Sequence, residues 1–359
     1  MRYILLLMVL LTSLFLLTGC QQALVEESES DDTITIVTSL FPLYDFAKQV
    51  GGDKVSVTLL LPPGAEAHSF DPRPSDILKL EQADMFIFIG EDFETWAHSI
   101  LESLGNQNLV VIEAMDHVHL IEDGHEHHHE EHTHEGNHTT DYDHHDEHET
   151  THANDHHDEE HDDHIEDHHN ETHSHSHDHH HGDYDPHIWL DLHNAEDIVK
   201  EIARQLIALS PEHEAHFTAN KDAYVAELEA LDDRFFAELA TCEKDEFLVG
   251  GHNFFGYIEH RYGVTGIAAI DNLEPNAEPT PQRIAQIATV AQEHNISYIL
   301  TEVLVGQRMA EAIAEEVGAS ILQFHPLESI SRDDFERGKT FIEGMSHNLE
   351  VLKTALQCS

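Results

Sequence analysis

Three histidines, His68, His187 and His252, each lie at the end of a predicted strand or the start of a loop. Neutral imidazole is a good ligand for zinc and related metals, and α/β proteins keep binding groups at such positions. A fourth position follows the last predicted strand, in FHPLES, where either His325 or Glu328 could face a metal. These positions are candidates for one specific metal site assembled from distant parts of the chain; the alternative for each histidine alone is a surface or hydrogen-bonded core residue.

A second, diffuse kind of metal chemistry is predicted between His117 and His181, which contains 25 of the 36 histidines. This insertion has almost no large apolar residues, so we expect it to be disordered without metal. Many equivalent imidazoles predict several moderate, poorly selective sites that weaken as the pH falls through about 6.5. The alternative is a solvated acidic spacer.

His187 differs from the histidines of the insertion because its neighbours can be packed. It stands between Pro186 and the apolar residues Ile188, Trp189 and Leu190. Such neighbours anchor a backbone, so we expect a fixed ligand here and mobile ligands upstream.

The formal net charge of -54 excludes several classes of partner. Nucleic acid and anionic lipid would be repelled, so neither is expected as the main ligand, and cations are favoured. No Lys or Arg occurs between Lys79 and Lys200, which concentrates the negative charge in one segment.

We expect the protein to be a monomer.

The amino terminus predicts export. Residues 1–19 combine Arg2 with an apolar run that is short for a membrane span, and LTGC ends at Cys20. This pattern resembles a bacterial lipobox, in which the cysteine is acylated, and residues 20–32 would form a flexible tether. We therefore expect a lipid-anchored protein of the cell envelope on the extracytoplasmic side; the alternative is an ordinary secretory signal.

The chain has three cysteines, and two of them, Cys242 and Cys358, remain once Cys20 is assigned to the lipid anchor. In an exported protein a pair of cysteines tends to oxidise, so we predict a disulfide that closes a long loop. The alternative is a free Cys358 in a frayed terminus.

Strand and helix patterns alternate in the first part of the chain and predict an α/β lobe over 33–194 that includes the insertion 117–181. The predicted strands are Thr33–Leu40, Val55–Leu61, Met85–Ile89 and Leu109–Ile112, and the predicted helices are Phe41–Val50, Pro74–Gln82 and Phe93–Leu104.

Two amphipathic stretches, Ala195–Leu209 and Pro211–Ala240, then predict a rigid helical connector over 195–241, and the alternation resumes in a second lobe over 242–359. The strands expected there are Glu246–Gly251, Val264–Ile270, Ile296–Glu302 and Ala319–Phe324, and the helices are Phe254–Tyr262, Pro281–His294, Arg308–Val317 and Arg332–Leu356. The predicted architecture is two Rossmann-like α/β lobes joined by a long helix. Two of the four ligand positions come from each lobe, which predicts a metal site in the interlobe cleft.

Five ordered stretches carry a family resemblance: PPGAEAHSFDPRPSD, DPHIWLD, GGHNFFGYIEHRYGV, EPNAEPTP and FHPLES. With the acidic, histidine-rich insertion, they resemble the metal-binding solute-binding lipoproteins of bacterial zinc and manganese ABC importers. The resemblance covers about residues 33–358. It implies two α/β lobes bridged by a rigid helix, one metal between them, and delivery of that metal to a membrane permease.

The same resemblance assigns ligands. His68, His187 and His252 fall on the three histidine ligands of the zinc-type members, and Glu328 falls where many members supply a carboxylate. His325 departs from the pattern, because similar proteins often have Asp or Asn there; it could bind the metal, displace Glu328, or support it from behind. Three imidazoles and one carboxylate suit Zn²⁺ better than manganese, which prefers more oxygen ligands.

Three functions compete on these observations. The first is a zinc-binding receptor of an ABC importer, with manganese as the alternative cargo. The second is a zinc hydrolase, which would need an open metal position and a general base; the four-ligand set and the absence of an H-E-x-x-H motif outside the insertion argue against an enzyme. The third is a metal-binding surface adhesin or zinc buffer.

Overall fold

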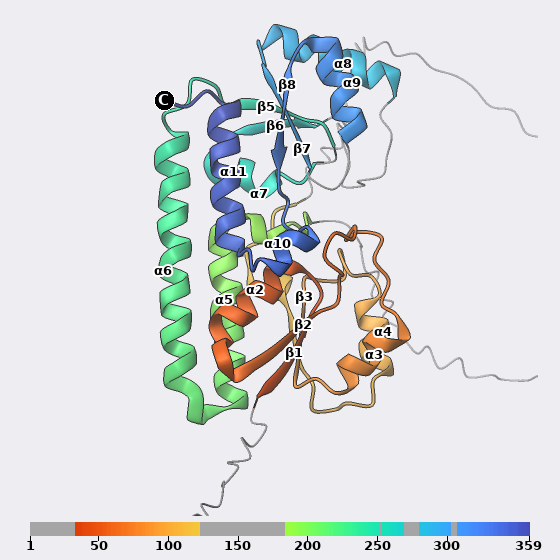
Figure 1. The fold of residues 1–359 in the computed structure, drawn as a ribbon, viewed down its shortest axis with the longest axis vertical. Helices are drawn as coiled ribbons and strands as arrows, with labels where there is room; N and C mark the ends of the chain where they lie inside the picture. The colour runs from red at the N-terminus through yellow and green to blue at the C-terminus, as the bar shows by residue number, and fades with distance from the viewer. Residues whose placement is uncertain (1–32, 123–183, 252, 269–279, 303–306) are drawn as a thin grey trace, which may run out of the picture. The chain divides into compact units, whose positions relative to one another are not determined.

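The computed structural model describes residues 33–122, 184–251, 253–268, 280–302 and 307–359 (Figure 1). The predicted signal peptide, the tether with Cys20, the insertion beyond residue 122 and His252 lie outside these ranges. None of the helices in the described part has both the length and the apolar character needed to span a lipid bilayer.

The first half of the chain forms a parallel four-stranded sheet in the order β2-β1-β3-β4. Its strands are β1 (Ile34–Thr38), β2 (Val55–Leu59), β3 (Met85–Phe88) and β4 (Val110–Glu113). Its helices are α2 (Phe41–Gly51), α3 (Pro74–Glu81) and α4 (Ala97–Ser103), with short 3-10 helices η1 (Gly52–Lys54) and η2 (Ala114–His117).

Both faces of this sheet are covered, and β3 shows why. All four of its residues are buried. Met85 and Ile87 belong to the apolar cluster that includes residues of α2, while Phe86 and Phe88 belong to a separate cluster with residues of α3 and α4. Successive side chains of a strand point to opposite faces, so a continuous apolar run is what a parallel strand between two helical layers requires.

The second half repeats this arrangement in a parallel sheet of order β6-β5-β7-β8. Its strands are β5 (Glu246–Val249), β6 (Thr265–Ala268), β7 (Tyr298–Glu302) and β8 (Ser320–Phe324), and its helices are α7 (Gly256–Tyr262), α8 (Pro281–Glu293), α9 (Gln307–Val317), α10 (Arg332–Glu336) and α11 (Phe341–Ala355). The predicted α/β class, with two parallel sheets, is confirmed.

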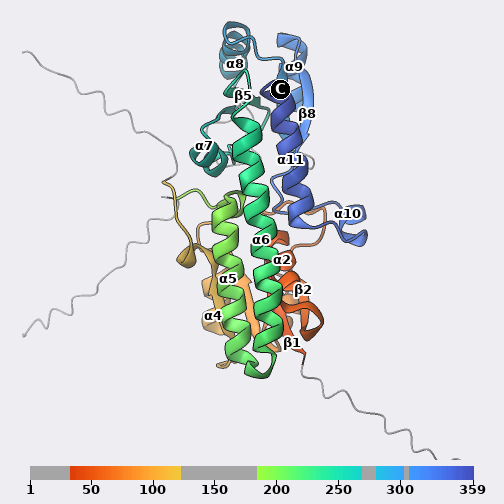
Figure 2. The same ribbon diagram turned by 90° about the vertical axis from the view of Figure 1, so that its left-hand side faces the viewer.

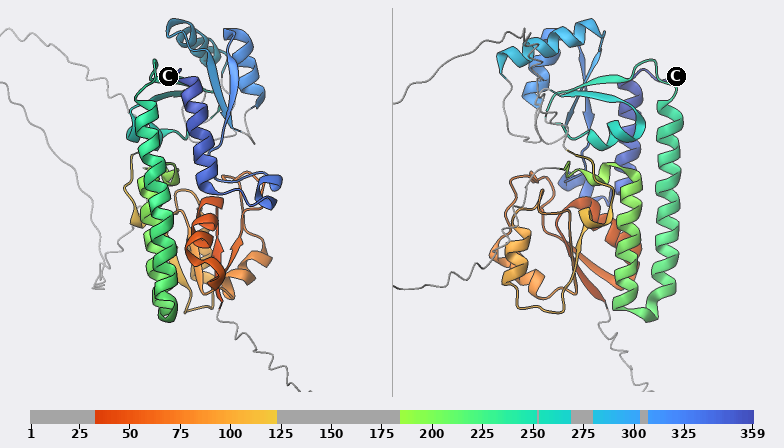
Figure 3. Two further views of the ribbon diagram at one scale, coloured as in Figure 1. Left: turned by 60° about the vertical axis from the view of Figure 1, so that its left-hand side comes forward. Right: turned by 180° about the vertical axis from the view of Figure 1, so that it is seen from behind.

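Two long helices join the halves: α5 (Leu192–Leu209) and α6 (Glu214–Leu239), preceded by η3 (Ile188–Leu190) and separated by η4 (Pro211–His213). Asp191 caps α5 by accepting from the backbone amides of His193 and Asn194. α6 runs beside α5 (Figure 2) and packs on α2 in the first half and on α7 and α11 in the second. Figure 3 shows α6 and α11 side by side from another direction.

Two helix predictions were wrong at their boundaries. The helix predicted over Phe93–Leu104 begins only at Ala97, because Glu94 turns back and its carboxylate accepts from the amides of Ile89 and Gly90, which holds the preceding residues in a turn. The predicted helix Arg332–Leu356 is two helices. Gly338 takes a left-handed φ of 75° after α10, and Thr340 then caps α11 anew.

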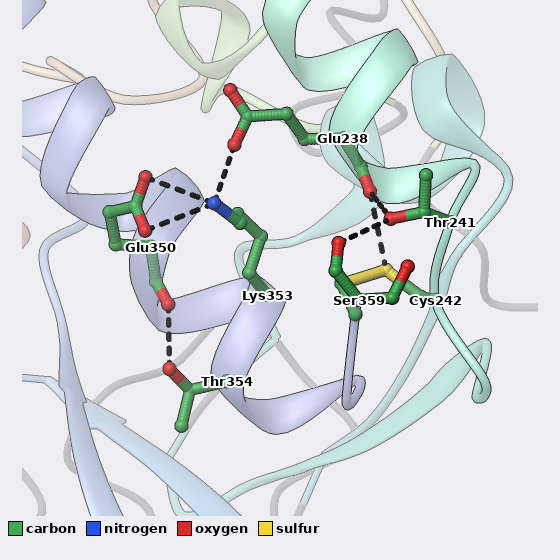
Figure 4. The surroundings of a disulfide bond; sticks show 8 residues. Glu238, Thr241, Cys242, Glu350, Lys353, Thr354 and Ser359 are labelled. Atoms are coloured by element: carbon green, nitrogen blue, oxygen red, sulfur yellow. Dashed lines mark hydrogen bonds and ion pairs between the residues drawn. A yellow bond between two sulfur atoms is a disulfide. The ribbon is translucent and has the colours of Figure 1, made fainter.

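The predicted disulfide between Cys242 and Cys358 is present. It ties the residues after α6 to the end of α11 across 116 positions of sequence. Figure 4 shows a polar contact beside it: Lys353 of α11 lies 2.6 Å from a carboxylate oxygen of Glu238 of α6. Both contacts connect the same two helices.

Replacing both cysteines with serine should lower the free energy of unfolding by about 4 to 5 kcal/mol, because the unfolded chain regains the entropy of a long loop. Denaturant unfolding of the oxidised protein and the double variant measures this difference. Each single serine variant should behave as the double variant does. An unchanged unfolding midpoint would show that the bridge does not constrain the chain.

Candidate metal centre

His68 is positioned by the loop after β2, which folds back on itself. Pro62, Pro63 and Gly64 make a turn closed by the amide of Ala65 on the carbonyl of Pro62 at 2.9 Å, and Gly64 supplies the φ of 83° that the turn requires. The Glu66 carboxylate then accepts from the amide of His68 at 2.7 Å.

The ring of His68 packs against Phe93, with ring centroids 4.7 Å apart. Phe93 is largely buried and comes from the turn before α4. The Glu66 hydrogen bond therefore fixes the backbone of His68, and the contact with Phe93 fixes its imidazole ring.

His187 is fully buried at the start of η3. The Asp185 carboxylate accepts from its backbone amide at 2.9 Å and lies 2.8 Å from its Nδ1. With Nδ1 engaged in this way, Nε2 is the ring nitrogen that would bind a metal. The apolar residues that follow, Ile188, Trp189 and Leu190, are all buried, as the sequence led us to expect.

Glu328 reaches the two histidines from the loop after β8. Three hydrogen bonds attach this loop to the first half of the chain: the indole of Trp189 donates to the carbonyl of Pro326 at 2.7 Å, and the amides of Phe41 and Gly64 donate to the carbonyl of Glu328 and the hydroxyl of Ser329. The preceding Leu327 has a φ of 65°, a strained conformation for leucine. The loop is held so that the Glu328 carboxylate faces inward.

The ligand atoms of His68, His187 and Glu328 all lie within 4.8 Å of one another. In the ranges that the structure describes, this is the one group of three or more such residues that could hold a metal. The carboxylate oxygens of Glu328 lie 3.6 Å from Nε2 of His68 and 3.9 Å from Nε2 of His187. A cation at the centre would meet two imidazole nitrogens and a carboxylate, a donor set that zinc accepts.

The side chain of His325 does not join the group formed by His68, His187 and Glu328. Its ring packs beside His347 of α11 at a centroid distance of 6.0 Å, and its backbone pairs with the side-chain amide of Asn348. Burial, with Lys339 and His347 nearby, lowers the pKa of His325 to about 4. Of the two alternatives for the fourth position, the structure brings Glu328 to the histidines and leaves His325 against α11.

His252 lies outside the described residues. The strand before it ends at Val249, and Gly251 approaches the carboxylate of Glu302 so closely that a Cβ there would lie 3.0 Å from it. Glu302 is buried at the end of β7 and acts electrostatically on His68. Glu302 was not among the residues predicted from the sequence, although it too is a polar residue at the carboxyl end of a strand.

The charges around His68 favour a cation. Burial acts to lower the pKa of His68, but the carboxylate of Glu328, with smaller contributions from Glu66 and Glu302, outweighs burial and raises that pKa above its ordinary value. The same carboxylates that stabilise the imidazolium would stabilise a metal ion in its place.

Comparison with known proteins identifies the family. Residues 36–355 match the model of the zinc-uptake complex component A, periplasmic, or ZnuA. The chain belongs to this family. As a ZnuA family member it is an extracytoplasmic zinc-binding component of an uptake system, and it is not an enzyme.

Relatives agree with this assignment. The high-affinity zinc uptake system protein ZnuA of Bacillus subtilis is 31% identical over 325 residues, covering 90% of this chain and 88% of the relative. The zinc-binding lipoprotein AdcA of Streptococcus pneumoniae is 30% identical, but this chain spans only 61% of its length. The Zn(II)-bound ZnuA-like domain of that AdcA is similar in structure, with a TM-score of 0.67 at 26% identity over 90% of this chain and 99% of the domain.

The contact between Gly344 of α11 and Leu327 allows a test of how the loop after β8, which carries Glu328, is held. A Cβ at this position would lie 2.5 Å from Cδ2 of Leu327. We expect Gly344→Ala to lower the free energy of unfolding by about 1 to 3 kcal/mol and to weaken zinc binding, because the strained loop must shift. Denaturant unfolding and a chelator competition measure the two effects. Unchanged values for both would show that Leu327 does not position Glu328.

Proposed function

We propose that this protein captures one Zn²⁺ with His68, His187, His252 and Glu328 and delivers it to the membrane permease of an ABC importer. The observation that carries the proposal is the convergence of His68, His187 and Glu328, from three distant segments, on one largely buried point. Four protein ligands satisfy tetrahedral zinc and require no open position for a reacting water, which suits a receptor.

Zinc rather than manganese is favoured by the donor atoms. Manganese prefers oxygen ligands, whereas imidazole nitrogen suits zinc. Two imidazoles and one carboxylate already face the point where the ion would lie, and His252 would add a third imidazole.

The remaining parts of the chain have proposed roles too. Cys20 would carry a lipid that anchors the protein to a membrane, residues 20–32 would act as a tether, and the insertion 117–181 would bind further zinc weakly. We propose lobes over 33–194 and 242–359 joined by a connector over 195–241, and a monomeric receptor.

The ligand assignment is tested with two histidines that are both largely buried and lie in different surroundings. His187→Ala should lose the tightest equivalent of zinc, with affinity at least about 100-fold lower, since loss of even a supporting residue costs about 10- to 100-fold. His325→Ala is the matched control and should keep that equivalent. Titration of the full chain against a chelator strong enough to empty the weaker sites of the insertion measures both.

The opposite result, tight binding lost in His325→Ala and kept in His187→Ala, would overturn the assignment.

Glu328→Gln tests the carboxylate in the same titration. It keeps the shape of the side chain but removes its charge, so it should weaken zinc binding without unfolding the protein.

The pH dependence of tight binding follows from the raised pKa of His68. Zinc binds the neutral imidazole, so protons compete below the folded-state pKa, and a raised pKa moves this competition upward in pH. We expect affinity to be full at higher pH and to start falling at a pH above the ordinary histidine value of about 6.5. In Glu328→Gln the onset should move to lower pH, because the carboxylate that stabilises the imidazolium is gone.

Chelator competition at a series of pH values gives both curves. An onset that is the same in the two proteins would contradict the role given to Glu328.

A further inference from the structure

Asp185 contacts three parts of the described structure: His187, the segment that contains Ile121, and helix α7. Its carboxylate holds His187 through the backbone amide and Nδ1, and it is buried. Its own backbone amide donates to the carbonyl of Ile121 at 3.1 Å, next to the bridge between Glu122 and Tyr184. The backbone of Asp185, whose side chain orients His187, is therefore itself fixed by the segment that contains Ile121.

Helix α7, which belongs to the second half of the chain, packs against Asp185. The hydroxyl of Tyr257 donates to the carbonyl of Asp185 at 3.1 Å and lies 3.4 Å from the amide of Ile121, which donates to it. Gly256, the first residue of α7, leaves room for the carboxylate: a Cβ there would lie 2.4 Å from Oδ2 of Asp185 and 3.2 Å from Cδ1 of Ile121. No side chain larger than hydrogen fits at Gly256 while Asp185 keeps its position.

The orientation of the carboxylate matters because it selects the tautomer and ring position of His187. With Oδ1 against Nδ1, the opposite nitrogen, Nε2, faces Glu328. Rotation of the carboxylate would release Nδ1 and allow the ring to turn. Supporting hydrogen bonds of this kind commonly contribute about 10- to 100-fold to metal affinity.

We propose that Gly256 and Tyr257 are positioning residues for zinc binding: they hold Asp185 in the one orientation that presents Nε2 of His187 to the metal. This inference rests on the proposed function, because it takes His187 as a zinc ligand. It adds that α7, an element of the second half, controls a ligand that belongs to the first half.

The test is the rate at which the full chain releases its slowest equivalent of zinc into excess chelator. Asp185→Ala should speed release by about 10- to 100-fold. Asp185→Asn keeps an acceptor oxygen for Nδ1 and should restore most of the wild-type rate. Gly256→Ala and Tyr257→Phe should each speed release severalfold or more, although neither changes a ligand or Asp185 itself.

Two control variants carry the same chemical changes away from Asp185. Tyr262→Phe removes a hydroxyl in the same helix, one that donates to Asp232 at 2.8 Å. Gly105→Ala places a methyl group where the nearest atom is 3.6 Å away. Both should release zinc at the wild-type rate.

A double-mutant cycle separates positioning from general destabilisation. If Gly256→Ala acts by pushing on the carboxylate, it should have no further effect in the Asp185→Ala background, where the colliding atoms are absent. An effect of the same size in both backgrounds, or a Gly256→Ala rate equal to that of Gly105→Ala, would overturn the inference.

His187→Ala distinguishes failure of the inference from failure of the proposed function. If His187→Ala keeps the slow equivalent, the metal site itself is misassigned. If it loses that equivalent while the Asp185, Gly256 and Tyr257 variants behave as wild type, only the positioning role is wrong.

Discussion

The attachment of the Glu328 loop to the first half of the chain is the constraint on which the site depends. Glu328 follows the last strand of the second sheet, whereas His68 and His187 belong to segments of the first half. Hydrogen bonds from Trp189, Phe41 and Gly64 hold the loop across that sequence distance. A buried carboxylate beside two imidazoles is costly unless its charge is compensated, so this arrangement stabilises a bound cation.

Burial also explains how one site can stand apart from a chain rich in histidine. Each of the three proposed ligands is held by a neighbour of its own: Phe93 packs on His68, Asp185 orients His187, and Leu327 precedes Glu328 in the strained loop. Such preorganisation lowers the entropy cost of binding, whereas a segment without packing neighbours must order its ligands when the metal arrives. We therefore expect tight binding to depend on the surroundings of the imidazoles and not on their number.

Much of this organisation could be predicted from the sequence. Apolar runs with β-branched residues located every described strand, and the rule that binding groups lie at strand ends or loop starts selected His68 and His187 and limited the fourth position to His325 or Glu328. The break between α10 and α11 could not be predicted from periodicity, because the helical pattern continues through Gly338. It is set by capping at Thr340 and by Asp45 of α2, which accepts from the amide of Phe341. The choice between His325 and Glu328 was also out of reach, since it depends on a left-handed leucine that residue type disfavours.

The central claim is that one zinc ion lies among side chains from both halves of the chain, and anomalous diffraction at the zinc edge tests it most directly. Crystals of the full chain loaded with one equivalent of zinc should show a single strong peak about 2.0 to 2.2 Å from Nε2 of His68, Nε2 of His187 and a carboxylate oxygen of Glu328. A strong peak at any other place, with these three side chains out of bonding distance of it, would contradict the account.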